Sequence, residues 1–350
     1  MTTLSTLGQS DLLRSQFKTL QGGIQQLQTQ VATGEKTQRY GDLGAQATLD
    51  ISLRNQATLI DNFKNSISNL SIRTNLMDQS LSTIHDTALA VQNQAFATPS
   101  FSAQRINIVA SAKAAIDQIT QSLQTSVDGR NLFGGTMTQS NPVTGSATLL
   151  PTVQAAVTAA IAGGPANVAA AIQAAVSGAG SAGPPVVPPG VMATAASYYT
   201  GGLAHAPAQI DQGLTVDYSI TASDPAFLTL MQGLYTLASL PQPVGTTATP
   251  PDISDSDFDA AATAAASQIS QGLTQLQSLT EKNGRNEQFL TDENTAHDAT
   301  LTVLQGQINN IEQVDLADAS TRLAQLKTQL DASYQITANL STLNLIDFLK

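Results

Sequence analysis

Apolar residues recur every three or four positions near the start of the chain. From residue 13 to residue 31 the spacing alternates between four and three, which places one apolar side chain per turn on one side of a helix. The segment 33–44 follows with three glycines, which disfavour a helix, so we predict a turn or loop there. The first stripe, predicted to be a coiled-coil seam, consists of Leu13, Phe17, Leu20, Ile24, Leu27 and Val31.

A second and longer stripe predicts one continuous helix over residues 49–95, about 70 Å long at about 1.5 Å per residue. Pro99 ends it, because proline lacks the backbone donor that a helix needs. A third helix is expected from about residue 102 to residue 126, before the turn signal Asp128-Gly129. The second stripe comprises Leu49, Leu53, Gln56, Ile60, Phe63, Ile67, Leu70, Thr74, Met77, Leu81, Ile84, Ala88, Val91 and Ala95; the third helix should bury Ile108, Ala112, Ile116, Ile119 and Leu123.

The same helical spacing returns near the end of the chain. Because both ends share one period, we predict a mainly α fold, with a long antiparallel coiled-coil helical bundle formed by both termini. The C-terminal positions are Ile269, Leu273, Leu276, Leu301, Leu304, Ile308, Ile311, Leu316, Leu323, Leu326 and Leu330.

Between the helical ends, residues 138–255 predict a small α+β insert that contains a β-hairpin. Alternating apolar residues from Leu214 to Ile220 indicate a strand behind a turn, and Asp224-Pro225 indicates the start of a helix. Residues 143–195 are low in complexity and rich in Ala, Gly and Pro. Their alanine-rich pieces, 153–162 and 166–177, could form short helices, and the segment that links them is expected to be loop or polyproline-like. Because the composition is loop-like, we expect removal of residues 143–195 to leave export and assembly intact.

Charge and cysteine content exclude several classes of function. The chain has 15 Lys and Arg, 26 Asp and Glu and a formal net charge of −11, so we expect no nucleic-acid or membrane partner. It has no cysteine, which excludes disulfides and thiol chemistry. No apolar run approaches the roughly 18 residues that span a membrane. Residues 1–16 lack a signal-peptide pattern, so an extracellular location would require another export route.

The sequence offers no constellation of catalytic or metal-binding residues. His85, His205 and His297 are scattered, without a second ligand at helical spacing. The glycine-rich segment 128–135 lacks both the GxGxxG spacing and a phosphate-loop lysine, and no activated serine motif occurs. We therefore predict a protein that is not an enzyme and has no cofactor, metal or catalytic residue.

Several short segments resemble one family of bacterial proteins. Residues 33–36 look like the turn after that family's first helix, and residues 343–349 look like its leucine-rich end. On these segments the chain resembles the flagellin family, and within it the hook-associated proteins of the hook-filament junction, apart from roughly residues 143–195. The remaining matching segments are 128–136, 198–202, 224–227 and 314–319.

The resemblance implies a structural role in the bacterial flagellum. It implies a junction adapter between hook and filament that templates flagellin polymerisation, with terminal helices of many subunits forming concentric tubes around an export channel. The implied partners are a homo-oligomeric ring, an adjacent hook-associated protein, flagellin and an export chaperone at the C-terminal region. The implied location is extracellular, reached by type III export without a cleaved signal peptide.

The resemblance also divides the chain into functional parts. We expect an N-terminal assembly helix and turn (1–45), two halves of a helical rod (46–137 and 256–312), the variable insert (138–255) and a C-terminal assembly helix (313–350). The expected subunit-packing residues are Leu13, Phe17, Leu20, Ile24, Leu27, Val31, Leu316, Leu323, Leu326, Leu330, Leu340, Leu343, Leu345 and Leu349.

Three alternatives to the junction adapter stay open. A flagellin filament subunit is the nearest, and it differs in copy number. An enzymatic flagellin-like protein is disfavoured because residues 138–255 contain one histidine and no recognisable nucleophile. A non-flagellar coiled-coil adhesin is disfavoured because both termini resemble one family and no anchor segment is seen.

Overall fold

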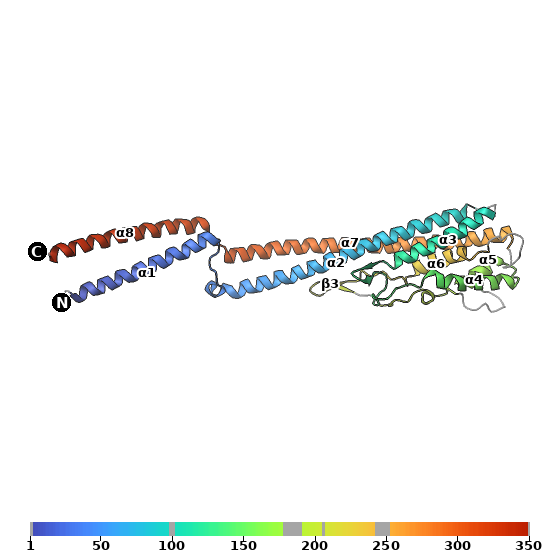
Figure 1. The fold of residues 1–350 in the computed structure, drawn as a ribbon, viewed down its shortest axis with the longest axis horizontal. Coiled ribbons are helices and arrows are strands. Elements are labelled where there is room, and N and C mark those ends of the chain that lie inside the picture. Colours follow the sequence, from blue (N-terminus) through green and yellow to red (C-terminus); the bar gives the residue numbers. More distant parts are fainter. Residues whose placement is uncertain (1–2, 98–101, 178–190, 205–206, 242–252, 349–350) are drawn as a thin grey trace. The chain divides into compact units, whose positions relative to one another are not determined.

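The computed structural model describes residues 3–97, 102–177, 191–204, 207–241 and 253–348, which are predominantly helical (Figure 1). This confirms the mainly α fold class, with long helices from both termini and a hairpin-containing insert. The helices are α1 (Thr3–Thr33), α2 (Gln46–Phe96), α3 (Ser102–Leu123), α4 (Ser146–Ala162), α5 (Val168–Ser177), α6 (Pro225–Ala238), α7 (Asp255–Glu312) and α8 (Leu316–Phe348), with short 3₁₀ turns η1 (Tyr40–Leu43) and η2 (Ala195–Ser197). The strands are β1 (Ser126–Val127), β2 (Arg130–Asn131), β3 (Ala208–Asp211) and β4 (Leu214–Val216).

The chain divides into two compact units. The first contains residues 1–61 and 297–350, and the second contains residues 62–296. In the first unit α1 packs against α8, and the start of α2 packs on the end of α7. That second contact has a small apolar core of Leu53, Leu304, Ile308 and Ile311.

The long helix predicted over residues 49–95 is confirmed as α2, but at its start the buried face is shifted by one position although Leu53 stays buried. From Ile67 to Ala95 the predicted stripe is buried throughout. At the start of the helix, however, Leu49 is 54% exposed, while its neighbour Asp50 is fully buried. An α-helix drifts relative to a strict seven-residue repeat, so the inward face moves by one position over a helix of this length.

The second unit encloses a continuous apolar core. The predicted inward residues of α3, from Ile108 to Leu123, are all buried there. The core also takes Phe133, whose ring meets Phe227 edge to face at 6.0 Å between centroids. The C-terminal positions Ile269, Leu273 and Leu276 on α7 are buried in the same core.

The Asp128-Gly129 turn signal closes a small hairpin that the sequence analysis did not specify. Strands β1 and β2 pair antiparallel, with Val127 opposite Arg130. Asp128 and Gly129 both have positive φ, 52° and 72°. Two positive φ angles in a two-residue loop match the right-handed twist of the strands, which explains the Asp-Gly pair.

Two segments that resembled the family separately pack against each other in the second unit. The Gly202 N–H donates to the Gly134 carbonyl at 3.0 Å, and the Thr200 N–H donates to the Pro142 carbonyl at 2.9 Å. A side chain on Gly135 would place its Cβ only 2.0 Å from the Gly202 carbonyl oxygen. The close backbone approach therefore requires glycine at this position.

The alanine-rich pieces of residues 143–195 form the short helices that the sequence allowed, so the loop-like character expected of the segment is wrong for α4 and α5. Helices α4 and α5 bury apolar side chains in the main core, because alanine-rich sequence with valine and isoleucine at helical spacing forms amphipathic helices. The proline cluster 184–190 lies outside the described residues. The buried positions include Leu149, Val153, Val157, Ile161, Ile172 and Val176.

The predicted strand after the turn 211–213 is confirmed but is shorter than expected. Strand β4 ends at Val216, paired with Ala208 at the start of β3. Pro207 precedes Ala208 and has no N–H to donate, which offers a physical reason for the ladder to stop there. Tyr218 and Ile220 remain buried beyond the strand. Helix α6 begins at Pro225, as predicted.

Replacing Gly135 with alanine should destabilise the second unit more than replacing Gly129 with alanine. Both glycines have positive φ, which costs an alanine about 1–2 kcal/mol, but only Gly135 also meets a backbone carbonyl. We expect Gly135→Ala to lower the urea midpoint clearly further, as measured by circular dichroism. Equal midpoints for the two variants would show that the contact with Gly202 adds nothing.

Candidate functional site

Helices α1 and α8 lie side by side and antiparallel, and they bring the two predicted terminal stripes together (Figure 1). The Phe17 ring stacks on the Tyr334 ring, with 5.1 Å between centroids and 19° between planes. The Gln21 side-chain amide donates to the Tyr334 hydroxyl at 3.3 Å. Gly23 faces Leu326, whose Cδ1 would lie 3.2 Å from a Cβ on the glycine.

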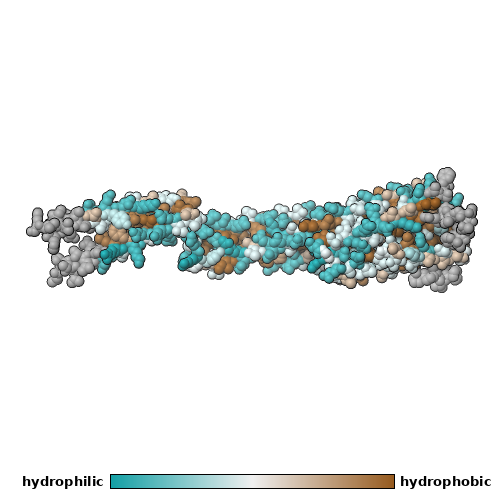
Figure 2. Space-filling model, viewed as in Figure 1, coloured by the Kyte–Doolittle hydropathy of each residue, from teal (hydrophilic) through white to brown (hydrophobic). Residues whose placement is uncertain are grey.

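The seam between α1 and α8 is only partly covered. Of the six predicted α1 positions, Ile24 is buried and the other five keep part of their surface exposed. On α8, Leu323, Leu326 and Leu330 are also partly buried. Figure 2 shows apolar side chains reaching the surface over this pair of helices. The α1–α8 pair therefore has apolar surface to offer to further chains.

The α8 side of the seam differs from the prediction at its start. Leu316 is 51% exposed, whereas Ala319 is buried. A step of four residues back from Leu323 reaches Ala319, so the periodicity includes this position. The prediction names Leu316 instead because leucine is the larger apolar residue. The side chains of Leu340, Leu343 and Leu345, as well as Leu349, lie outside the described residues.

A lysine joins the turn after α1 to the end of α7 within the first unit. The Lys36 Nζ donates to the carbonyls of Asn310 and Ile311, at 2.6 and 3.0 Å. Its backbone N–H donates to the Glu312 carbonyl at 2.7 Å, and the Val314 N–H donates to the Gly34 carbonyl at 2.9 Å. A cation on the free carbonyls of a last helical turn is favourable. The turn that follows α1 and the turn between α7 and α8 are thus held together.

A charged cluster lies beside this pair of turns. Arg54 donates to both carboxylate oxygens of Glu312, at 2.5 and 2.6 Å, and its Nε donates to Asp50 Oδ2 at 3.2 Å. Burial raises the pKa of the Asp50 carboxyl, and the neighbouring Glu312 raises it further. The hydrogen bond to Glu312 raises the pKa of Arg54, so the guanidinium stays charged.

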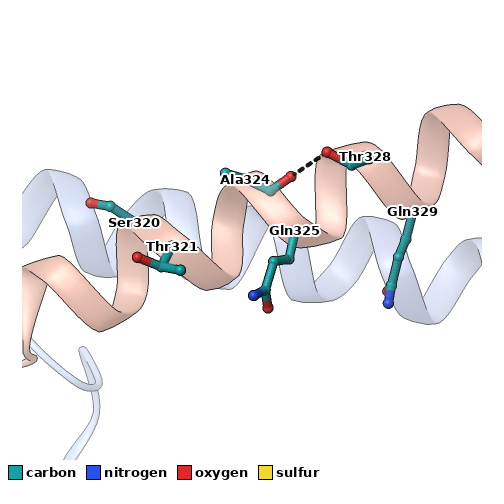
Figure 3. Close-up of a pocket in the computed structure, with 6 residues that line it drawn as sticks. All are labelled: Ser320, Thr321, Ala324, Gln325, Thr328 and Gln329. Atoms are coloured by element: carbon teal, nitrogen blue, oxygen red, sulfur yellow. Dashed lines mark hydrogen bonds between the residues drawn. The ribbon is translucent and has the colours of Figure 1, made fainter.

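One face of α8 away from the seam carries small and uncharged polar side chains around a shallow hollow. Figure 3 shows them along the helix, with the Thr328 hydroxyl donating to the Ala324 carbonyl at 3.0 Å. Such a surface can form hydrogen bonds but offers no charge for holding an ion. The residues lining the hollow are Ser320, Thr321, Ala324, Gln325, Thr328 and Gln329.

The histidines do not meet in the described part of the chain. The exposed His85 side chain lies 3.2 Å from the Asp86 carboxylate, from Nδ1 to Oδ1, and His297 is buried in α7. His205 lies outside the described residues. Among the residues that are described, no group of three or more His, Asp or Glu side chains is arranged to hold a metal ion. None of the described helices combines the length and the apolar content that crossing a membrane requires.

Comparison with solved structures supports the same fold. A protein from Vibrio parahaemolyticus described as a flagellar hook-associated protein superposes with a TM-score of 0.52 at 13% sequence identity. The match covers 76% of this chain and 97% of that chain. No curated protein matches the sequence.

Comparison with protein families finds a match over the C-terminal helices. Residues 266–349 match the C-terminal helical region of bacterial flagellin. These residues form most of α7 and the whole of α8, including the side of the candidate site that faces α1. Over this region the chain is similar to the flagellin family.

Proposed function

We propose that the chain is a structural, non-enzymatic component of the flagellum that acts as a junction adapter between hook and filament and templates flagellin polymerisation. The incompletely covered seam between α1 and α8 is the observation that carries this proposal. The protein would act outside the cell, after type III export without a cleaved signal peptide.

The partly exposed seam supports packing between copies of this chain. Removing apolar surface from water contributes about 25 cal/mol per Å², and two helices alone leave part of this gain unrealised. Neighbouring α1–α8 pairs in a homo-oligomeric ring would cover the remainder. The predicted stripes, from Leu13 to Val31 and from Leu323 to Leu349, are the proposed contact residues.

The uncharged face of α8 supports a position beside an export channel. Ser, Thr and Gln side chains would let an unfolded chain pass without strong ionic binding. In this arrangement residues 1–45 and 313–350 are the assembly segments, residues 46–137 and 256–312 form the rod, and residues 138–255 form the insert. An adjacent hook-associated protein, flagellin and a chaperone at the C-terminal region are the proposed partners.

A flagellin filament subunit is the second candidate, favoured by the family match to flagellin itself. The shared fold with the hook-associated protein over 97% of its length supports the junction role instead. The two candidates differ in copy number per flagellum, and the secreted fraction of cells would distinguish them.

In the isolated subunit, the amides of α1 and α8 should exchange faster than those of α3 and α6. The terminal pair has a partly exposed seam, whereas α3 and α6 lie in a closed core. Hydrogen exchange followed by mass spectrometry on the monomer and on assembled flagella would test this. Strong protection of α1 and α8 at concentrations without oligomers would contradict the proposed role of the seam.

Replacing Leu326 with aspartate should block assembly before it blocks folding. The new carboxylate would be buried between helices, at a cost of several kcal/mol, while the second unit keeps its own core. In cells we expect the variant to be made and exported but not retained at the hook tip. Electron microscopy should then show hooks without filaments, with intact flagellin in the medium.

Ala317→Asp is the matched control for Leu326→Asp. Ala317 is exposed in the first turn of α8, where a negative charge is favourable, so filaments should form. If cells carrying Leu326→Asp instead lose filament mass while this chain dominates the secreted fraction, the result would favour the filament subunit over the adapter. Normal filaments on cells carrying Leu326→Asp would rule out packing through this stripe.

A further inference from the structure

A buried carboxyl group lies in the second turn of α2, where the sequence could have placed a leucine. Asp50 is fully buried, and the preceding Leu49 is 54% exposed. Asp50 Oδ2 accepts from Arg54, but Oδ1 is buried and has no hydrogen-bond donor among the described residues. Burying an ionised carboxylate without full hydrogen bonding is costly. The burial of Asp50 beside an exposed leucine therefore requires an explanation.

A second carboxyl group stands next to the first. Glu312, at the end of α7, accepts two hydrogen bonds from Arg54 Nη2, so a single guanidinium bonds both its carboxylate and that of Asp50. One guanidinium balances one carboxylate. A proton held between Asp50 and Glu312 would balance the second and would give Asp50 a hydrogen bond to donate.

The groups around this pair come from three elements. Arg54 lies on α2 with Asp50, Glu312 lies on α7, and Tyr40 of η1 lines the same cavity as Arg54. The neighbouring Lys36 is bound to carbonyls of α7. A cavity of about 230 Å³ lined by Arg39, Tyr40 and Glu312, among others, adjoins the cluster and gives solvent a route to it.

Glu312 also connects the cluster to the turn that follows α1 and the turn that precedes α8. Its backbone carbonyl accepts the Lys36 N–H, and the next contact along the chain joins Val314 to Gly34. A change in the hydrogen bonds of the Glu312 side chain would therefore affect the backbone contacts that join the two turns.

We propose that Asp50, Arg54 and Glu312 form a proton-dependent lock on the contact between residues 34–36 and 312–314. With the proton present, the Asp50 hydroxyl donates to Glu312 while Arg54 donates to both groups. Asp50 is then neutral, and Arg54 and Glu312 form one ion pair. When the proton leaves to solvent, two carboxylates share one guanidinium, Glu312 turns toward the cavity, and the contact loosens. This lock does not depend on the flagellar role.

The direction of the pH effect follows from linkage. The pKa of Asp50 is raised in the folded chain, so the folded state holds a proton that the unfolded state releases. Stability from this cluster is complete below the ordinary aspartate pKa and decreases as pH rises through the raised value.

The test measures hydrogen-exchange protection of the Lys36 and Val314 amides in the full chain between about pH 4 and pH 8, corrected for intrinsic rates. We expect protection to fall severalfold with rising pH in the native chain. Asp50→Asn imitates the protonated form, so its protection should stay high and independent of pH. Asp61→Asn removes an exposed carboxylate from the same helix and should behave as the native chain does.

Flat protection in the native chain would overturn the proposal, as would a native-like pH dependence in Asp50→Asn. Should Asp50→Asn fold poorly, Glu312→Gln gives an independent test. Without the second carboxylate Asp50 loses one cause of its raised pKa, so the fall in protection should move to lower pH. An unchanged midpoint in Glu312→Gln would likewise reject a shared proton.

Discussion

Two helices cannot enclose a broad apolar stripe, and this constraint governs the terminal pair of the chain. Helices α1 and α8 meet along matching stripes, yet Phe17, Leu326 and most of their neighbours keep part of their surface exposed. Positions on α3 and α6 are instead enclosed within one core. The same apolar periodicity thus gives an enclosed core in the second unit and a partly exposed seam between α1 and α8.

Charged contacts of the first unit gather where α1 ends and α8 begins. Lys36 covers the end of α7, and Arg54 joins α2 to Glu312. Such contacts matter because the seam alone offers limited burial. Interactions at the turns bring α1 and α8 close together, which lowers the entropy cost of pairing them.

The helices could be predicted from the sequence because amphipathic periodicity persists over many turns. Errors arose where the inward face shifted by one residue, as at Asp50, or where a small residue took a seam position, as at Ala319. The burial of α4 and α5 was underestimated because glycine and proline clusters beside the alanine-rich pieces gave the segment a loop-like composition. The contact between Gly134 and Gly202 could not be predicted, since no local pattern encodes which distant loops meet.

The candidate site was predictable in outline but not in its polar detail. The stripes on α1 and α8 follow from spacing alone, whereas the Asp50, Arg54 and Glu312 cluster joins residues far apart in the sequence. Pairing across such a distance depends on how the turns fold, which the one-dimensional pattern does not contain.

Thiol labelling of Leu330→Cys would test whether neighbouring subunits cover the seam between α1 and α8. The native chain has no cysteine, so a maleimide reagent would report this position alone. We predict rapid labelling in the free subunit and strong protection in isolated hook-filament assemblies. Equal labelling rates in the two states would contradict the claim.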